Sequence, residues 1–226
     1  MPTTLTKHVL TIFLILCLAG CQSFTGPSSS TGDYSPLNVG DMLQLVNSAD
    51  SSTQFFTVLG NVKRQDGTIV FAIVRKIGTL FPADTLYRFF RDGYLISTLM
   101  DSSTRNALPG NPFAEARIAK VNPSNGETWI KTLCSPDTVF ITAAYVPRLS
   151  TFCCTFEDVF AFTETYYSNG QSNVTGSEDY YAKDIGLIGY SGYLYIFRIN
   201  WRATYVKCGS HERGKPWPAR ESLPGP

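Results

Sequence analysis

The stretch LYRFFRDGYLISTL, residues 86–99, decides how this chain folds. Apolar and aromatic residues alternate with polar ones on both sides of Asp92-Gly93, which is the two-residue period of a half-buried β-strand. An Asp-Gly pair between two such runs favours a tight hairpin turn, because glycine adopts a positive φ without steric cost. The stretch therefore predicts two antiparallel strands, 86–90 and 94–99.

The same pattern extends in both directions along the chain. Residues 55–63 and 68–76 predict a second hairpin, joined through Asp66-Gly67. No segment after residue 21 predicts a helix of three turns. We therefore expect an all-β fold, with residues 37–208 as a single domain. Further strands are predicted over 42–46, 114–120, 128–133, 138–145, 152–167, 180–182, 186–190 and 193–206.

The first 21 residues carry an export signal. Lys7 precedes an apolar run, 9–18, which is too short to span a bilayer as a helix. The run ends in Leu18-Ala19-Gly20-Cys21, which resembles the lipobox of bacterial lipoproteins; an ordinary signal peptide with a chance cysteine is the alternative. The resemblance implies that residues 1–20 are removed and that Cys21 carries acyl chains that anchor the protein in the cell envelope. Because Gln22 is not the Asp of an inner-membrane retention signal, the outer membrane is favoured where the host has one.

Composition indicates which partners the protein is suited to and where its folded domain begins and ends. Without its signal the chain has 18 basic and 18 acidic residues, a balance that argues against a nucleic-acid partner. Residues 21–36 are rich in Ser, Thr, Gly and Pro and predict a flexible tether to the membrane. Residues 209–226 are rich in Gly, Pro and charge, and they predict a disordered tail.

Four cysteines lie in the expected mature domain: Cys134, Cys153, Cys154 and Cys208. Export permits disulfides, and a bond between the adjacent Cys153 and Cys154 is geometrically poor. Two frameworks follow, in which Cys134 and Cys208 each join one of the neighbours. If the pair lies on a strand, one thiol points to each face, so a single bridge beside one buried free thiol is the alternative. We expect no metal and no cofactor, since the mature chain has only one histidine, His211, and no CxxC spacing.

Three segments resemble a pattern found in uncharacterised secreted and lipid-anchored bacterial proteins. They are 34–41 (YSPLNVGD), 146–154 (VPRLSTFCC) and 181–188 (YAKDIGLI). The family versions contain Tyr-Pro-Leu followed by Gly-Asn, then Val-Pro-Ala-Gly-Thr-Phe, and then Tyr-Ala-Pro-Gly-Val-Gly-Leu-Val. This chain departs from them at Asp41, at 148–150 and at Lys183-Asp184. The resemblance implies an antiparallel curved sheet, of clam or partial-barrel type, and no established activity.

Catalytic chemistry finds little support in the sequence. A Ser-His-Asp or Cys-His site needs a histidine in the folded body, and His211 lies beyond the last predicted strand. Asp158 and Glu164 would be about 20 Å apart along one strand, too far for a glycosidase pair. We therefore interpret Glu157, Asp158 and Glu164 as solvated charges and expect no enzyme, with a carboxylate-based envelope hydrolase as a distant alternative.

Aromatic residues are the remaining clue to function. In an incompletely filled curved sheet they would line an apolar cavity with polar tips. We therefore predict that the protein binds an apolar, lipid-like ligand or an envelope protein, the alternative being a structural or interaction lipoprotein with a filled core. The residues predicted to line the cavity are Tyr87, Phe89, Tyr94, Tyr145, Tyr193 and Tyr195.

Overall fold

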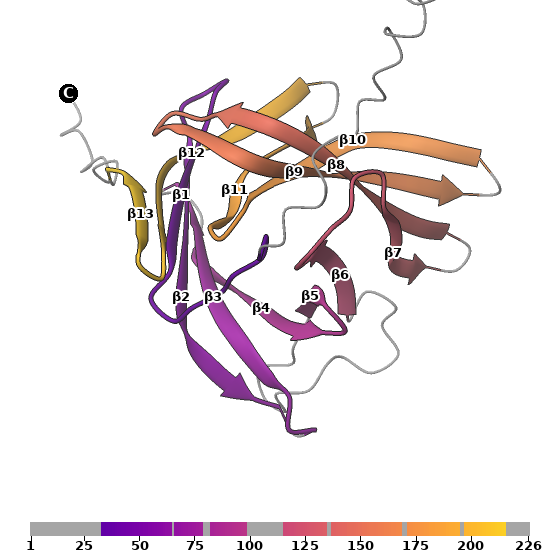
Figure 1. Ribbon diagram of the computed structural model, residues 1–226, viewed down its shortest axis with the longest axis horizontal. Coiled ribbons are helices and arrows are strands. Elements are labelled where there is room, and N and C mark those ends of the chain that lie inside the picture. The colour runs from indigo at the N-terminus through magenta and orange to yellow at the C-terminus, as the bar shows by residue number, and fades with distance from the viewer. Residues whose placement is uncertain are drawn as a thin grey trace, which may run out of the picture. The chain divides into compact units, whose positions relative to one another are not determined.

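The computed structural model describes residues 33–64, 66–78, 82–98, 115–134, 137–168, 171–194 and 197–215. The described residues contain strands and turns and no helix, which confirms the predicted all-β class (Figure 1). No helix in these ranges is long and apolar enough to cross a membrane. The strands are β1 (Met42–Asn47), β2 (Thr53–Lys63), β3 (Ile69–Ile77), β4 (Asp84–Arg91), β5 (Tyr94–Thr98), β6 (Glu115–Lys120), β7 (Thr128–Cys134), β8 (Asp137–Ser150), β9 (Thr155–Ser168), β10 (Gln171–Ala182), β11 (Gly186–Leu194), β12 (Phe197–Cys208) and β13 (His211–Gly214).

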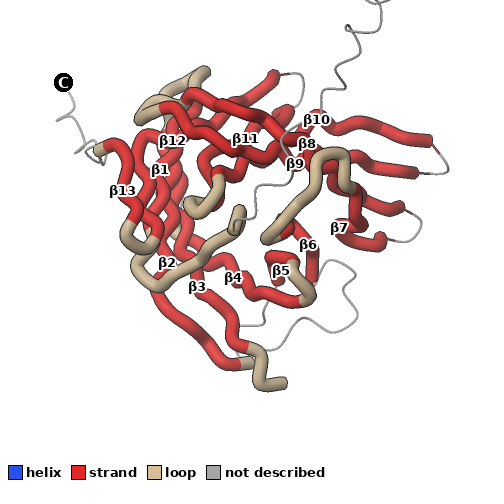
Figure 2. The backbone as a smooth tube through the Cα atoms, in the orientation of Figure 1, coloured by secondary structure: helices blue, strands red, loops and turns tan. Residues whose placement is uncertain are grey.

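All strands belong to one antiparallel sheet. Its order is β6-β5-β4-β3-β2-β1-β12-β11-β10-β9-β8-β7, and β13 pairs with β12. Each neighbouring pair within β1 to β6 and within β7 to β12 is consecutive in sequence, so two meanders meet where β1 pairs with β12. Figure 2 shows this run of hairpins curling around an interior.

The two ends of the strand order, β6 and β7, approach each other. The Trp129 indole Nε1 on β7 donates a hydrogen bond to the Arg117 carbonyl oxygen on β6, at 3.1 Å. Lys120 at the end of β6 forms an ion pair with Glu127, just before β7. The sheet is therefore nearly closed into a barrel, as the curved-sheet prediction expected, with side chains spanning the gap between its two edges.

The Asp92-Gly93 turn follows its sequence signal, whereas another predicted turn does not. Arg91 pairs with Tyr94, and the intervening Asp92 and Gly93 have φ values of 54° and 75°. The strands predicted over 186–190 and 193–206 imply a turn at Ser191-Gly192, and this prediction is wrong, because β11 continues through both residues, with Ser191 paired to Asn200. Composition alone suggested a turn there, but both residues remain in the ladder between β11 and β12.

Residues 159–162 of β9 and 180–182 of β10 are buried on both faces of the sheet. Phe160, Phe162 and Tyr181 enter one cluster with Trp129, whereas Ala161, Tyr180 and their same-face neighbours enter another. Alternation sends adjacent tyrosines to opposite sides of a strand, so the Tyr180-Tyr181 pair requires cover on both faces. We call the side that carries Phe162 and Tyr181 the inner face.

Both predicted domain boundaries need correction. Tyr34 is fully buried, its backbone N–H donates to the Val121 carbonyl at 3.0 Å, and its ring meets Phe160 edge-on. The folded domain therefore includes residues 33–36, which composition places in the tether. Residues 211–214, predicted as disordered tail, form β13, because 205–208 of β12 extend beyond the part of the strand that pairs with β11 and offer backbone groups for pairing. The remainder of the predicted tether and tail, 21–32 and 216–226, lies outside the described residues.

Candidate functional site

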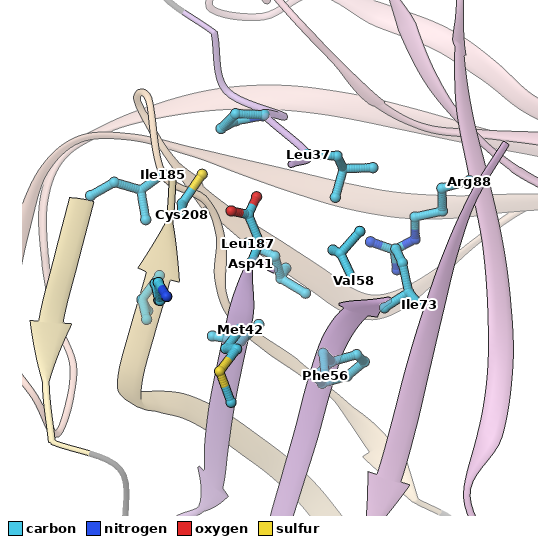
Figure 3. Close-up of a pocket in the computed structure, with 14 residues that line it drawn as sticks. Leu37, Asp41, Met42, Phe56, Val58, Ile73, Arg88, Ile185, Leu187 and Cys208 are labelled. Atoms are coloured by element: carbon cyan, nitrogen blue, oxygen red, sulfur yellow. The ribbon is translucent and has the colours of Figure 1, made fainter. Parts of the chain in front are cut away.

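An apolar pocket opens where the chain's first folded segment meets β2, β3, β11 and β12. Leu37, Val58, Ile73 and Leu187 contribute aliphatic wall, and Arg88 of β4 reaches the same space (Figure 3). The cavity volume is about 60 Å³, against ~10–15 Å³ for the smallest space that holds one water. It can hold a few waters or a short alkyl segment, but it is far below the ~300–1,000 Å³ of a drug-sized ligand site.

Arg88 is a basic residue in this mainly aliphatic wall. Its guanidinium points toward Val58 and Ile73 (Figure 3). Its Nε atom is buried and has no hydrogen-bond partner. Among the described residues, no carboxylate lies within 4.0 Å of its guanidinium nitrogens. A partly buried cation with no carboxylate in direct ion-pair contact can accept an acidic group of a ligand.

Charged groups on the inner face lie near Arg88. Glu164 forms an ion pair with Lys131 of β7, and the two side chains are 14% and 22% exposed. Asp179 of β10 pairs across the ladder with Phe162, so it occupies the inner face on the diagonal from Glu164. We call Arg88, Lys131, Glu164 and Asp179 the inner charge cluster.

Burial perturbs the acids of this region. Desolvation, reinforced by the negative charge of Glu164, raises the pKa of Asp179 from 3.8 to about 6, although Lys131 and Arg88 oppose the shift. Desolvation also raises the pKa of Tyr181, whose hydroxyl is buried and has no hydrogen-bond partner. Arg88 influences both groups although β4 and β10 are far apart in strand order, so the curl of the sheet faces them toward each other.

The groups of this region can bind a ligand that has both an acidic and an apolar part. Glu164 is engaged by Lys131, and the Tyr181 hydroxyl remains protonated, so neither is an activated nucleophile or base. Arg88 can donate to an acidic group of a ligand, while the aliphatic wall accommodates an apolar part. No group of three or more His, Cys, Asp or Glu side chains within the described ranges is arranged to hold a metal ion.

A carboxylate at the pocket's rim joins the two ends of the domain. Asp41 Oδ2 accepts from the Asn38 backbone N–H at 2.6 Å, and its Oδ1 accepts from the Gly209 N–H at 2.7 Å. Cys208 is buried beside them, and burial together with the charge of Asp41 raises its pKa to about 12. This corner therefore fixes one wall of the pocket and keeps the Cys208 thiol protonated.

The aromatic residues predicted to line a cavity pack in the cores instead. Phe89 is 1% exposed, and Tyr94 contacts Trp129 with ring centroids 5.9 Å apart. Tyr145 packs against Phe160 and donates from its hydroxyl to Asp158 at 2.6 Å. None of these, nor Tyr87, lines the pocket; the aromatic residue that does so is Phe56 of β2. Rings that pack closely in a core leave no space for a ligand. The side chains of Tyr193 and Tyr195 lie outside the described residues.

The cysteines do not follow the predicted frameworks. Cys153, Cys154 and Cys208 are free thiols in the structure, so no bridge joins Cys208 to either neighbour. The side chain of Cys134 and the whole of Cys21, the predicted lipidation site, fall outside what the structure describes.

The three carboxylates interpreted as solvated charges have different environments. Glu157 fits that interpretation, since it is exposed and pairs with the exposed Arg148. Asp158 accepts the Tyr145 hydrogen bond. For Glu164 the interpretation is wrong, because its side chain is mostly buried on the inner face. Sequence reasoning also missed Arg88, whose only signal was a charge within an otherwise apolar strand pattern.

Comparisons with known proteins support no family assignment. No family model matches the chain, and no curated protein matches it. A structure from Parabacteroides distasonis, described as that of a candidate lipoprotein, superposes with a TM-score of 0.45 and 11% identity, covering 78% of this chain and 99% of its own. A candidate exported protein with a YmcC-like fold from Bacteroides fragilis gives a TM-score of 0.42 and 9% identity over the same shares.

Proposed function

We propose that this chain is a lipid-anchored protein of the bacterial cell envelope that binds a small ligand with an apolar part and an acidic group. The pocket wall receives the apolar part, and Arg88 receives the acid. The protein performs no reaction on the ligand. The anchor part of the proposal rests on the Leu18-Ala19-Gly20-Cys21 segment, which resembles a lipobox.

The single observation that carries the binding proposal is the buried Arg88 Nε in an aliphatic wall, which has no hydrogen-bond partner among the described residues. A charge-assisted hydrogen bond to a carboxylate or phosphate would satisfy its guanidinium, which the described protein groups leave without an ion-pair partner. The small volume of the cavity limits the bound segment to a short chain or a chain end. The proposal therefore refines the predicted apolar ligand to a short amphiphilic acid.

A second candidate function is a structural or interaction lipoprotein that binds no small ligand. The filled aromatic cores support it, since Phe162 is 1% exposed and contacts both Trp129 and Tyr181. In that case an envelope protein would be the partner, and Arg88 would be satisfied by water alone.

Native mass spectrometry of the mature chain from residue 22, purified without detergent or organic solvent, separates the two candidates. Residues 33–215 contain every described contact, so this chain keeps the whole fold. We expect an added mass that is lost on organic extraction and that corresponds to an acid with a short chain. A bare protein mass, unchanged after incubation with octanoate, would contradict ligand binding and favour the interaction protein.

The anchor is tested separately in cells. Cys21→Ser removes the only sulfur that lipoprotein processing could acylate at this position. We expect the variant to leave the membrane fraction or to accumulate with its signal uncut. Fractionation with membranes in fully processed form, as for the parent, would show that the anchor lies elsewhere.

A further inference from the structure

The two adjacent cysteines lie in the turn between β8 and β9, beyond the ladder. Ser150 and Thr155 are the last paired residues, so 151–154 form a tight turn. Strand alternation therefore does not apply to the pair, contrary to our expectation of one thiol on each face. The two Sγ atoms are 3.4 Å apart.

Hydrogen bonds fix this turn from within and from outside. The Thr151 N–H donates to the Cys154 carbonyl at 2.9 Å, and its hydroxyl donates to the same oxygen at 2.9 Å. The Cys153 N–H donates to the Ala203 carbonyl of β12 at 3.1 Å. The thiols are thus held together by a structured turn that is docked on a neighbouring strand.

Strand β13 covers Cys153 through a glycine. A Cβ atom at Gly214 would lie 2.6 Å from the Cys153 Cβ and 2.2 Å from the Thr204 carbonyl oxygen, and Gly214 has a φ of 81°. Only glycine permits this close approach. The short strand β13, which composition did not predict, thus has a specific contact with the cysteine turn.

Both thiols are half-buried, and the neighbouring Phe152 is 57% exposed, so a small solute can reach the turn. Cys208, the other described thiol, is buried against the Asn38 amide at 3.8 Å. Among the described thiols, Cys153 and Cys154 contact each other through their sulfur atoms, whereas the Cys208 sulfur contacts Asn38.

We propose that Cys153 and Cys154 are a vicinal dithiol that oxidises reversibly to a disulfide within the β8–β9 turn. The oxidant is another disulfide, RSSR. One cysteine thiolate attacks RSSR, forming a mixed disulfide and releasing one thiolate; the second cysteine thiolate attacks the protein sulfur of that mixed disulfide and releases the other. The two cysteine protons end on the two released RS groups, so RSSR is reduced to two RSH as the dithiol is oxidised.

The bond should be easily reduced. Adjacent Cα atoms are about 3.8 Å apart, below the ~4.4–6.8 Å that unstrained disulfides prefer. Strain of this kind raises the reduction potential and makes a disulfide labile. Burial and the neighbouring thiol also raise the pKa of Cys154 to about 11, so exchange through this thiol should quicken as the pH rises.

The test incubates the folded mature chain with oxidised glutathione and maps its peptides by mass spectrometry. We expect the peptide that contains both cysteines to lose two hydrogen atoms and to regain them with dithiothreitol. Cys153→Ser and Cys154→Ser should each stop at a stable glutathione adduct. Cys208→Ala is the matched control and should still form the bond; Cys134→Ala replaces it if circular dichroism shows that removing Cys208 unfolds the domain.

The parent chain alone decides the question, so the result does not depend on any variant folding. A bond from Cys208 or Cys134 to either neighbour, a lasting glutathione adduct in the parent, or no reaction in the folded chain would each overturn the proposal. Because the cysteine turn and the Arg88 pocket use different residues, failure here leaves the proposed ligand binding unaffected.

Discussion

The inner face contains two contrasting regions, an aromatic core and the Arg88 pocket. In the core, Phe162 lies between Trp129 and Tyr181, with ring centroids 5.3 and 5.1 Å apart, and all three are at most 5% exposed. The pocket is bounded mainly by aliphatic side chains, retains about 60 Å³ of space, and contains Arg88, which forms no ion pair with any described residue. Most of the inner-face aromatic residues are used for packing, whereas the pocket has a mainly aliphatic wall with one aromatic lining residue, Phe56.

The largest expected effect on stability comes from creating a cavity in the aromatic core. Phe162→Ala should lower the free energy of unfolding by about 3–5 kcal/mol, because it removes a fully buried ring and leaves a cavity among its partners. Urea denaturation followed by tryptophan fluorescence measures this change. An effect below about 1 kcal/mol would mean that the aromatic core is loosely packed and that the contrast between the two regions is false.

The next prediction compares Lys131, which forms an ion pair, with Arg88, which forms none with the described residues. Lys131→Met leaves the mostly buried Glu164 without its ion pair and should cost about 1–3 kcal/mol, less than the ~3–5 of a fully buried pair. Arg88→Met removes a cation with no ion-pair partner among the described residues, and should leave stability unchanged or raise it. Equal destabilisation by the two variants in the same denaturation assay would show that Arg88 has a partner in the folded protein.

A smaller effect concerns the pH dependence of stability. The folded-state pKa of Asp179 is about 6, above its ordinary 3.8, so the native state binds this proton more tightly than the unfolded chain does. The tighter binding of this proton stabilises the native state fully below about pH 4, and this stabilisation is lost as the pH rises through about 6.

Asp179→Asn should therefore raise the melting temperature at pH 7 and differ little from the parent at pH 4. The exposed Asp50→Asn serves as a control that should show no such gain at neutral pH, since hydrogen bonds from Ser52 lower the pKa of Asp50. A lower melting temperature for Asp179→Asn at pH 7 would mean that the ionised carboxylate makes a favourable contact in the native state.

Local features of the fold could be predicted from the sequence because they depend on adjacent residues. The Asp92-Gly93 turn and its flanking strands are an example: the glycine φ and the two-residue period are set within a dozen residues. Burial of Tyr34 could not be predicted in the same way, because its partner Phe160 is far away in sequence. The pairing of β13 could not be predicted either, since it depends on residues 205–208 of β12, which β11 does not cover.

The candidate site escaped prediction for the same reason. Arg88 and Asp179 occupy strands separated by five others in the sheet, and only the curl of the sheet brings their charges together. The faces of the two cysteines were predicted wrongly because the predicted strand began at residue 152, whereas β9 begins at Thr155 and 151–154 form the turn. Periodicity assigns faces within a strand, but it does not tell where a long strand gives way to a turn.

Calorimetric titration of octanoate and octanol into the mature chain, its Arg88→Met variant and the exposed control Arg148→Met tests the central claim most directly. We expect the parent and Arg148→Met to bind octanoate more tightly than octanol. Arg88→Met should lose about tenfold to a hundredfold in octanoate affinity while its octanol affinity changes little, because a hydrogen bond to a charged group is worth about 1.5–3 kcal/mol. Octanoate affinity that is absent in the parent, or unchanged in Arg88→Met, would contradict the account.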